Sequence, residues 1–475
     1  MSSAAFHSVH LPKLTLPQGI SRTFPSLENR SFRLLLSGLL VSGTGGWIQR
    51  IAQDWLVLTM TDSPTAVGVV TAFQFVPTLL LGLHGGLLAD RFPKRTILLA
   101  TQVSMALTAA ALAALTLSGA VQVWHVFGLA FVLGVVAAVD NPTRQSFVSE
   151  VVTGPQLPNA ISLVSCTFQI GAMTGPVIGG VLMSTMGAGY AFAVNAATFV
   201  GPIVALSLMR DTGHRPGAAT APGADPGTGA GTAPATGVDT AQTVQVSASQ
   251  VAASGVPASP RVRDGLAYAL HTPNVLWPVI MVGAFGFFTI SLPVTLAAFA
   301  KNEFHTGASG LGLLNAMVAV GALGGALATA RRTRPLRLRT VGYAAWALAV
   351  ALLLAAGARY QLLFTLVLVL VGAANLGFLT KAQSLVQLAA VDHLRGRVVG
   401  IYMLVFIGSG AIGGPVVGWL AEAHGARIAL LASGAVPAVV TAVVTHRLAR
   451  RADLRLGLTA VSVRLPRPSV VPRNH

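Results

Sequence analysis

The chain has 475 residues, of which 53% are hydrophobic and 9% are charged, and its formal net charge is +17 at pH 7. Ordinary soluble domains carry about 25% charged residues, so this composition excludes a soluble globular protein and indicates an integral membrane protein. The lone cysteine, Cys166, excludes an internal disulfide bond and a cluster of thiolate metal ligands.

The predicted elements begin after a cytoplasmic N-terminal tail, residues 1–33, which has no apolar core long enough for a cleavable signal peptide. Twelve later stretches are each apolar and long enough to cross a hydrocarbon core of about 30 Å. The sequence therefore predicts an all-α integral membrane fold with twelve transmembrane helices. The predicted spans are 34–58, 65–84, 96–117, 122–141, 159–185, 188–209, 274–299, 308–330, 338–357, 361–380, 398–421 and 427–446.

The composition changes in the middle of the chain. Residues 210–263 are dominated by Ala, Gly, Pro, Thr and Ser, which predicts a disordered cytoplasmic linker between two six-helix bundles, 34–209 and 264–446. Three landmarks recur in the same order in both bundles, and this indicates a parallel repeat with a substrate site between the halves near the membrane midplane. The matched landmarks are 85–95 with 324–334, 145–148 with 383–386, and 175–176 with 414–415.

The basic residues border the predicted spans unevenly. If the N-terminus is cytoplasmic, nearly all Lys and Arg lie on the cytoplasmic side, including those of a basic C-terminal tail, residues 447–475. The exceptions are Lys301, Arg359 and Arg427, which face outward, and Arg50, which lies within a span. The positive-inside rule then places both termini in the cytoplasm, in a multi-pass protein of the plasma membrane. Because the charges border apolar spans, we expect contact with anionic lipid headgroups and no binding of nucleic acid.

Three segments carry a resemblance to a known family. Residues 47–57, the turn at 61–64 and residues 140–148 resemble the branch of the major facilitator superfamily that holds bacterial enterobactin exporters and macrolide-efflux pumps. The likeness to the superfamily extends over all twelve predicted helices. It implies a secondary active efflux transporter that exchanges protons for a lipophilic or amphiphilic drug, secondary metabolite or siderophore by alternating access, and we expect a monomer. The alternatives within the same fold are a proton-coupled nutrient importer, a lipid flippase and a transporter-like sensor.

The resemblance implies a gate in the segment between the second and third spans. Gly86 allows close approach to a helix of the other half, and Asp90 faces the positive N-terminus of the helix that begins near residue 397. The family pairs the basic end of this motif with an acid, here Lys94 with Asp140. The alternative is that the basic residues only anchor the chain at the membrane surface. The residues of the predicted gate are Gly86, Asp90, Arg91, Lys94, Arg95, Asp140 and Arg144.

Small residues at a spacing of four mark the fifth span, together with a proline that frees a backbone carbonyl and allows bending. This pattern resembles the antiporter motif of exporters in the superfamily, and the resemblance favours export over uptake. Packing of small residues alone is the alternative. The residues of the motif are Gly171, Gly175, Pro176, Gly179 and Gly180.

Arg50 and Asp54 are the only formal charges well within a predicted span. Each would cost about 2.5 to 3.5 kcal/mol at the membrane centre if it faced lipid, so both must point inward or toward water. They lie four residues apart on one helical face. Asp54 is therefore the candidate for proton coupling, with Arg50 as its neighbour. The alternatives are a permanent structural salt bridge and an interfacial anchor near two tryptophans.

The candidates for the substrate cavity are polar and aromatic residues of the spans. Gln49, Gln53 and Asn375 are the polar candidates, and Asn375 is favoured because family folds line the cavity with the first, fourth, seventh and tenth helices. Phe285 and Phe288 offer an apolar wall to a lipophilic cargo. The alternatives are interhelical hydrogen bonds for the amides and lipid contact for the phenylalanines.

The motifs that the sequence lacks argue against an enzyme. It has no phosphate loop of the Gly-x-x-x-x-Gly-Lys-Ser/Thr type, and its histidines show no metal-ligand spacing. We therefore expect no cofactor and no metal, and transport driven by a proton gradient instead of nucleotide hydrolysis.

Overall fold

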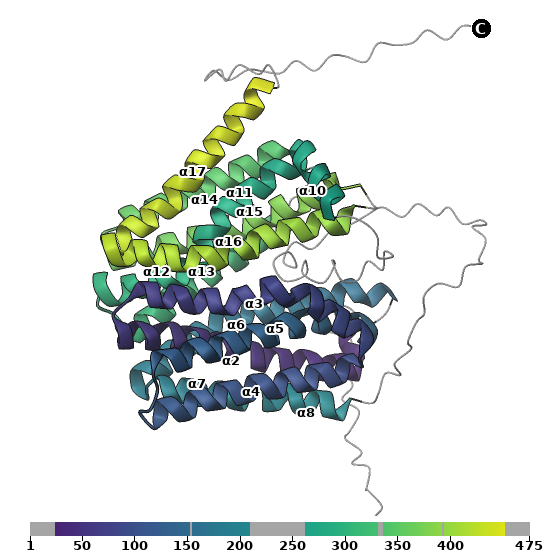
Figure 1. Ribbon diagram of the computed structural model, residues 1–475, viewed down its shortest axis with the longest axis vertical. Helices are drawn as coiled ribbons and strands as arrows, with labels where there is room; N and C mark the ends of the chain where they lie inside the picture. Colours follow the sequence, from purple (N-terminus) through teal and green to yellow (C-terminus); the bar gives the residue numbers. More distant parts are fainter. Residues whose placement is uncertain (1–23, 153, 210–261, 331–335, 392–393, 452–475) are drawn as a thin grey trace, which may run out of the picture.

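The computed structural model describes residues 24–152, 154–209, 262–330, 336–391 and 394–451, and these ranges are almost entirely helical (Figure 1). The all-α prediction is confirmed. Short helical turns lie at η1 (Pro25–Glu28) and η2 (Gly154–Gln156), and a π-helix lies at η4 (Phe299–Glu303). The α-helices are α2 (Arg30–Thr61), α3 (Pro64–Arg91), α4 (Lys94–Leu117), α5 (Val123–Val151), α6 (Leu157–Thr185), α7 (Ala188–Thr198), α8 (Val200–Leu208), α10 (Val262–His271), α11 (Pro273–Thr289), α12 (Leu292–Ala298), α13 (Gly307–Ala330), α14 (Leu338–Gly357), α15 (Gln361–Ala389), α16 (Arg395–His424) and α17 (Ala426–Arg451).

Eleven helical segments in the described ranges are long and apolar enough to cross a membrane. Three of them join consecutive helical elements, namely η2 with α6, α7 with α8, and α11 with α12 and η4. The helix α2 is 32 residues long but is not among the eleven, because its glycines, glutamines and charged residues lower its mean hydropathy. The segments indicate a multi-pass membrane protein.

Each predicted span coincides with helical residues, but most helices extend beyond the predicted ends. The largest extensions follow the spans predicted at 122–141 and 361–380, because α5 continues to Val151 and α15 to Ala389. A helix needs apolar side chains only where it crosses hydrocarbon, so polar residues beyond the membrane edge do not end it.

Three predicted segment boundaries shift for the same reason. α2 begins at Arg30, inside the predicted N-terminal tail, where the Asn29 side chain caps it by accepting hydrogen bonds from the first backbone N–H groups. α10 begins at Val262, inside the predicted linker, and α17 ends at Arg451, inside the predicted C-terminal tail. The rest of the linker, and most of both tails, lie outside the described residues.

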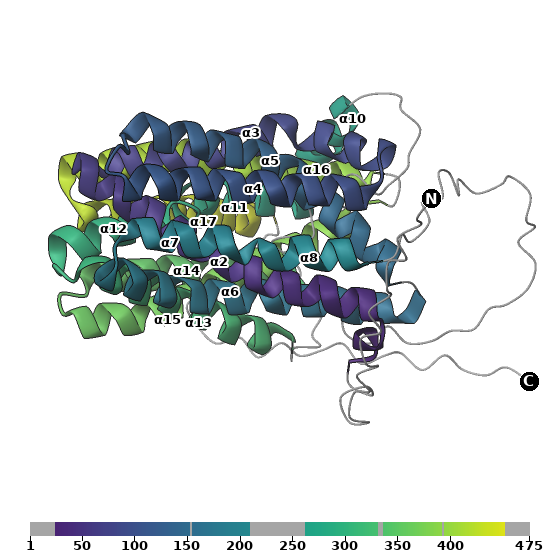
Figure 2. The ribbon, with the colours of Figure 1, turned by 90° about the horizontal axis from the view of Figure 1, so that it is seen from below.

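Consecutive long helices run in opposite directions between two faces of the molecule (Figure 2). We call the face that holds Asp62 and Ser63, between α2 and α3, the distal face. The opposite face, which holds Phe92 and Pro93 between α3 and α4, is the proximal face. Aromatic side chains that anchor a protein at a membrane–water interface are exposed near the distal ends of four helices. They are Trp124, Tyr190, Tyr360 and Trp419.

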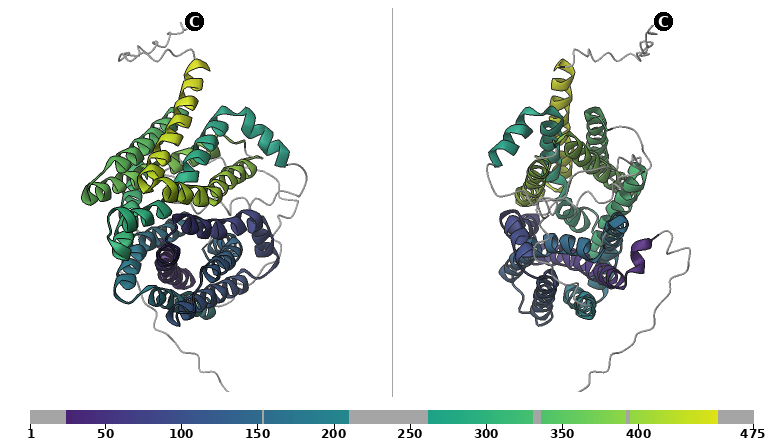
Figure 3. Two further views of the ribbon diagram at one scale, coloured as in Figure 1. Left: turned by 60° about the vertical axis from the view of Figure 1, so that its left-hand side comes forward. Right: turned by 90° about the vertical axis from the view of Figure 1, so that its right-hand side faces the viewer.

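The helices form two groups that follow the chain. The first half, α2 to α8, packs mainly within itself, and so does the second half, α10 to α17. The two halves lie one above the other in the views of Figures 1 and 3. They meet chiefly along two helix pairs, α3 with α16 and α6 with α13.

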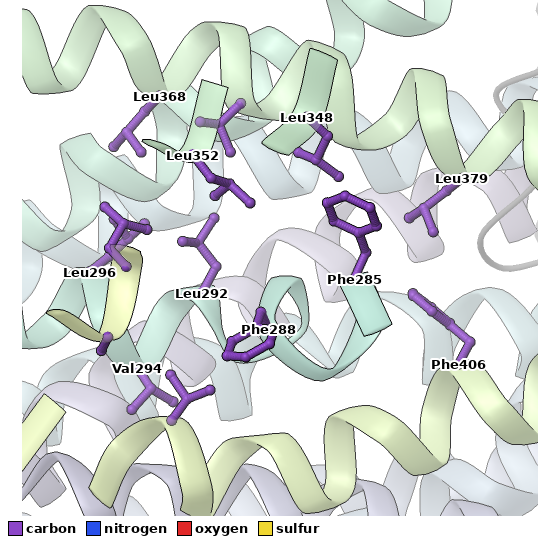
Figure 4. Close-up of a cluster of buried hydrophobic side chains, with 14 of the residues drawn as sticks. Phe285, Phe288, Leu292, Val294, Leu296, Leu348, Leu352, Leu368, Leu379 and Phe406 are labelled. Atoms are coloured by element: carbon purple, nitrogen blue, oxygen red, sulfur yellow. The ribbon is translucent and has the colours of Figure 1, made fainter. Parts of the chain in front are cut away.

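A continuous core of apolar side chains fills the second half and extends into the first half, and part of it is shown in Figure 4. Phe285 of α11 is 0% exposed, and its ring centre lies 4.9 Å from that of Phe378 on α15. Leu348 and Leu352 of α14 are buried beside them. Because lipid tails are as apolar as leucine, such contacts stabilise the half through close packing and not through removal of apolar surface from water.

Candidate functional site

Glycines bring the two halves into close contact in the distal part of the molecule. A Cβ atom on Gly68 of α3 would lie 2.1 Å from the carbonyl oxygen of Gly414 on α16. On the second helix pair, a Cβ atom on Gly312 of α13 would lie 2.3 Å from the carbonyl oxygen of Pro176 on α6. Any larger side chain at these positions would push the helices apart, so the halves touch here backbone against backbone.

A lysine crosses from one half to the other at the rim of this contact. Lys301, in η4 of the second half, lies with its Nζ 2.8 Å from Asp62 Oδ1, and it donates a hydrogen bond of 2.8 Å to the carbonyl oxygen of Leu58. Leu58 lies in the last turn of α2, and Asp62 follows that helix directly. The lysine thus binds a carboxylate and an end carbonyl of the same helix, both favourable for a cation.

A carboxylate makes the second polar link between the halves. Glu422, near the end of α16, accepts hydrogen bonds from Ser63 Oγ at 2.5 Å and from the backbone N–H of Thr65 at 3.2 Å. We call Asp62, Ser63, Lys301 and Glu422 the distal latch. The hydrogen bonds and ion pairs that the structure describes between the halves all lie at the distal face, so the protein is closed there.

The predicted proximal gate is described only in part. The Asp90 side chain, and with it the predicted contact to the start of α16, lies outside the described residues. Gly86 is buried, and the close approach of α3 to α5 is made by its neighbour Gly85, where a Cβ atom would lie 2.2 Å from the carbonyl oxygen of Ala138. Arg91 is the exposed last residue of α3.

The predicted ion pair between Lys94 and Asp140 is wrong. Lys94 forms an ion pair with Glu150, ten residues further along α5, and Asp140 is paired with Arg144. The physical reason is the length of α5. Because the helix continues to residue 151, it carries the Glu150 carboxylate to the proximal surface beside Lys94, and leaves Asp140 about 15 Å deeper along the helix axis.

Asp140 is the centre of a buried polar cluster within the first half. It is 0% exposed, and its Oδ1 accepts hydrogen bonds from Thr101 Oγ1 at 2.7 Å and Gln102 Nε2 at 3.0 Å, both on α4. Arg144 binds the other carboxylate oxygen. The buried charge is therefore compensated on both oxygens, and the cluster ties α4 to α5.

The described contacts of Arg95 are also within the first half. Its guanidinium donates hydrogen bonds to the carbonyl oxygens of Leu206 at 2.7 Å and Ser207 at 3.0 Å. These carbonyls belong to the last turn of α8, where a cation also interacts favourably with the helix dipole. Arg95 therefore connects the start of α4 to the end of α8, a role that the gating motif did not suggest.

Two amides of α2 point into the interior of the first half. Gln49 is 4% exposed and accepts a hydrogen bond from Asn195 on α7. Gln53 is 1% exposed and accepts a hydrogen bond of 3.4 Å from Gln74 on α3. The structure therefore favours interhelical hydrogen bonds for Gln49 and Gln53 over the predicted role in lining a cavity.

Arg50 and Asp54 lie one turn apart on α2, but they form no ion pair with each other in this conformation. The guanidinium carbon of Arg50 lies 5.8 Å from the centre of the Trp47 ring and 5.4 Å from that of the Phe75 ring on α3, which is a cation–π arrangement. Asp54 is 3% exposed, and among the described residues its carboxylate has no hydrogen-bond or ion-pair partner. The alternative of a permanent salt bridge between them is therefore wrong for this conformation.

The small residues of α6 pack in two directions. Gly171, Gly175 and Gly179 lie against α2, and a Cβ atom on Gly175 would lie 2.5 Å from Trp47 Cβ. Gly180 faces the second half, where its Cβ atom would lie 3.0 Å from a carbonyl oxygen of α13. The motif therefore brings α6 close both to the charged helix α2 and to the other half. Its role in the direction of transport stays a prediction.

The predicted aromatic wall of the cavity is not open to a ligand here. Phe285 is buried against Phe378 in the core of the second half, so its predicted contact with cargo is wrong for this conformation. Phe288 is 8% exposed and packs on Phe287, with ring centres 5.1 Å apart. Asn375 on α15 is partly exposed, and its buried Oδ1 has no hydrogen-bond partner in the described part of the chain. Asn375 thus remains a cavity candidate.

Sequence reasoning missed the distal latch and a charge within α15. From the sequence, Lys301 is predicted only to face outward. A detectable signal for the latch was present, because Lys301 follows the end of one predicted span and Asp62 follows the end of another. Lys381 was placed beyond a span predicted to end at residue 380, whereas α15 continues for eight residues past it.

The chain resembles known transporters in sequence. Residues 21–217 and 242–469 match the family of transmembrane secretion effectors. The chain is 29% identical over 440 residues to the multidrug efflux pump Tap of Mycolicibacterium fortuitum, which covers 89% of this chain and 97% of the pump. It is 31% identical over 166 residues to the staphyloferrin A transporter of Staphylococcus aureus, which covers 34% of this chain and 42% of that transporter.

Solved transporter structures share the fold. A bacterial homolog of the human lysosomal transporter Spinster, in an inward-facing and unoccupied conformation, matches with a TM-score of 0.66 at 14% identity, over 90% of this chain and 99% of that chain. A bacterial homologue of the iron transporter ferroportin, in an inward-facing state, matches with a TM-score of 0.63 at 16% identity, over 88% and 98% of the two chains. The chain is therefore a transporter and not an enzyme, and it belongs to the transmembrane secretion effector family of the major facilitator superfamily.

Proposed function

We propose that the protein is a secondary active exporter that exchanges protons for a lipophilic or amphiphilic small molecule. It acts as a monomer in the plasma membrane, with twelve transmembrane helices in two pseudo-symmetric bundles. α2 is the span that hydropathy alone does not identify. Both termini and the linker are cytoplasmic, so the proximal face is cytoplasmic and the distal face is extracellular. Similarity to a multidrug efflux pump over 89% of this chain supports export.

The environment of Arg50 and Asp54 is the observation that carries the proposal. A charge inside a membrane-spanning helix is costly, and it marks a substrate or ion pathway by default. Arg50 lies over the Trp47 and Phe75 rings and forms no direct ion pair with Asp54. The Asp54 carboxylate is therefore near a positive charge but not locked in a direct ion pair, which suits a group that gains and loses a proton during the cycle.

The proposed cycle starts from a state closed at the distal face, as described above. Cargo enters from the proximal side, the proximal gate of the Asp90 motif closes, and the distal latch opens. Asp54 then exchanges cargo for a proton from the distal side. The membrane potential supplies about 2.3 kcal/mol per charge per 100 mV, which is enough to concentrate a small molecule without nucleotide hydrolysis.

Transport in proteoliposomes with an imposed proton gradient tests the proposal. The cargo panel consists of lipophilic antibiotics and siderophores, the classes that the resemblance and the relatives indicate. We expect Asp54→Asn to abolish gradient-driven transport and to keep cargo counterflow, because the amide preserves shape but cannot exchange a proton. Glu150→Gln is the matched control, since it neutralises a carboxylate at the proximal surface, and it should keep coupling.

Two results would contradict the proposal. Coupled transport at the wild-type rate in Asp54→Asn would remove this carboxylate as the coupling site. Accumulation of cargo in the same direction as proton flow would show import, and the protein would then be the nutrient importer of the same fold.

A further inference from the structure

A groove opens on the side of the second half, between α13 and α14, with α15 as its floor. Its volume is about 490 Å³, within the range of about 300 to 1,000 Å³ of small-molecule sites. The three helices lie side by side along one edge of the molecule (Figure 2). The groove exists because α13 and α15 cross closely, where a Cβ atom on Gly325 would lie 2.4 Å from the carbonyl oxygen of Ala373.

The groove is apolar along most of its length and opens toward the surroundings of the molecule. Small residues such as Ala374 and Gly377 form its floor, and Val350, Leu354 and Leu370 form its rim. The rim side chains are 48%, 55% and 56% exposed. Such a surface on a membrane-spanning segment faces lipid tails, so an acyl chain is the molecule that reaches it.

One end of the groove is polar. The Nζ atom of Lys381 donates a hydrogen bond of 3.1 Å to the carbonyl oxygen of Gly377. A Cβ atom on Gly377 would lie 3.4 Å from this Nζ and 3.9 Å from Thr329 Oγ1. The ammonium group of Lys381 therefore lies over Gly377 at the edge of the groove, where it can donate to a phosphate oxygen, whereas the Thr329 hydroxyl donates its own proton to the carbonyl oxygen of Gly325 at 2.7 Å.

The position of Lys381 along α15 matches the level of lipid headgroups. Tyr360, which directly precedes α15 at the distal face, is 78% exposed, as expected of an interfacial tyrosine. The 21 residues from Tyr360 to Lys381 rise about 31 Å, which matches a hydrocarbon core of about 30 Å. Leu370 lies eleven residues before Lys381, so the groove descends about 16 Å from the proximal headgroup level.

We propose that this groove binds one anionic phospholipid of the proximal leaflet, with an acyl chain between α13 and α14 and the phosphate at Lys381. The long apolar part of the groove favours a lipid over a soluble anion, because only a lipid has an acyl chain to fill it. The lysine at the headgroup level selects an anionic headgroup over a zwitterionic one. The proposal concerns the outer side of the second half, so it does not depend on the direction or the coupling of transport.

Native mass spectrometry of the full-length protein with equal amounts of phosphatidylglycerol and phosphatidylcholine of identical acyl chains tests the proposal. We expect Lys381→Gln to lower the preference for phosphatidylglycerol about fivefold, the weight of one interfacial lysine. Ala347→Leu fills the groove, whose wall includes Ala347, and should lower retention of both lipids. Ala110→Leu is the matched control, because Ala110 is also an exposed alanine, on α4 of the first half, and it should retain both lipids.

The outcomes that overturn the proposal are distinct. An unchanged lipid preference in Lys381→Gln would show that the other basic residues of the proximal face attract the lipid. Equal losses in Ala347→Leu and Ala110→Leu would show that the groove is not the site. A phosphatidylglycerol with a photoreactive acyl chain should label peptides of α13, α14 and α15, and even labelling over both halves would also refute the site. If a lipophilic cargo abolishes this labelling and excess phosphatidylglycerol does not, the groove belongs to cargo and not to lipid.

Discussion

Lys301 holds the distal face shut in the structure, so Lys301→Gln should shift the protein toward a distally open conformation. The substitution removes the charge that faces Asp62 and the hydrogen bond to the carbonyl oxygen of Leu58. Glutamine is shorter than lysine and uncharged, so it restores neither interaction. The contacts of Glu422 with the start of α3 remain in the variant.

The free energy that Lys301 contributes to the closed state depends on how exposed the interacting side chains are. The Asp62 side chain is 80% exposed and that of Lys301 is 25% exposed, and such surface ion pairs contribute about 0 to 1 kcal/mol. A hydrogen bond that involves a charged group contributes about 1.5 to 3 kcal/mol, and the exposure of Lys301 reduces this value. We therefore expect Lys301→Gln to destabilise the closed state relative to the open state by about 1 to 2 kcal/mol. This change raises the ratio of open to closed molecules about 5- to 30-fold.

Pulsed electron–electron double resonance measures this ratio. Spin labels at Ala120 and Arg359 report the separation of the halves, because both residues are exposed at the distal face, and the exposed Cys166 is first replaced by serine. The control is Asp62→Asn, which keeps the left-handed backbone at φ 57° and removes only the ion pair, so its shift should stay below about fivefold. An unchanged distance distribution in Lys301→Gln would refute the latch.

Two further predictions concern packing within and between the halves. Asp140→Asn should lower the yield of folded protein and its Tm, because it leaves Arg144, whose side chain is 26% exposed, without its carboxylate, at a cost near the lower end of about 3 to 5 kcal/mol. Arg144→Gln in the same background should recover both, and an unchanged Tm in the single variant would contradict this reasoning. Gly68→Ala should prevent distal closure and abolish transport, because its Cβ atom would meet a carbonyl oxygen at 2.1 Å. Gly82→Ala on the same helix has no neighbour within 4 Å and should transport normally, and equal transport by the two variants would show that the close glycine contact is dispensable.

The positions of the helices follow from the sequence, because a bilayer requires an apolar run of fixed length for each crossing. Their ends do not, because nothing requires a helix to stop where the hydrocarbon ends. Pro142 lies inside α5 and does not end it, and α15 carries Lys381 within its length. The error in the length of α5 is also what produced the wrong partner for Lys94.

The candidate site was predictable as far as it depends on spacing along one helix. The four-residue interval of Arg50 and Asp54 placed both on one face of α2, as the structure has them. The residues that each charged side chain contacts depend also on the neighbouring helices, which spacing along α2 does not reveal. Arg50, for example, lies over the Phe75 ring of α3. Phe285 shows the same limit, since its burial depends on Phe378 from a helix nearly a hundred residues away in the chain.

Two kinds of contact explain how the distal face can be both tight and reversible. Contacts such as that of Gly68 with Gly414 contribute van der Waals packing, and at these glycines no interlocked side chains have to withdraw when the helices separate. The polar contacts of Lys301 and Glu422 lie at the rim, where water replaces them on opening, so they lack the large penalty of breaking a buried pair. Alternating access requires two conformations within a few kcal/mol of each other. A backbone seal with a hydrated polar rim keeps the closed and open states within that range, because neither state leaves a charge buried without a partner at this face.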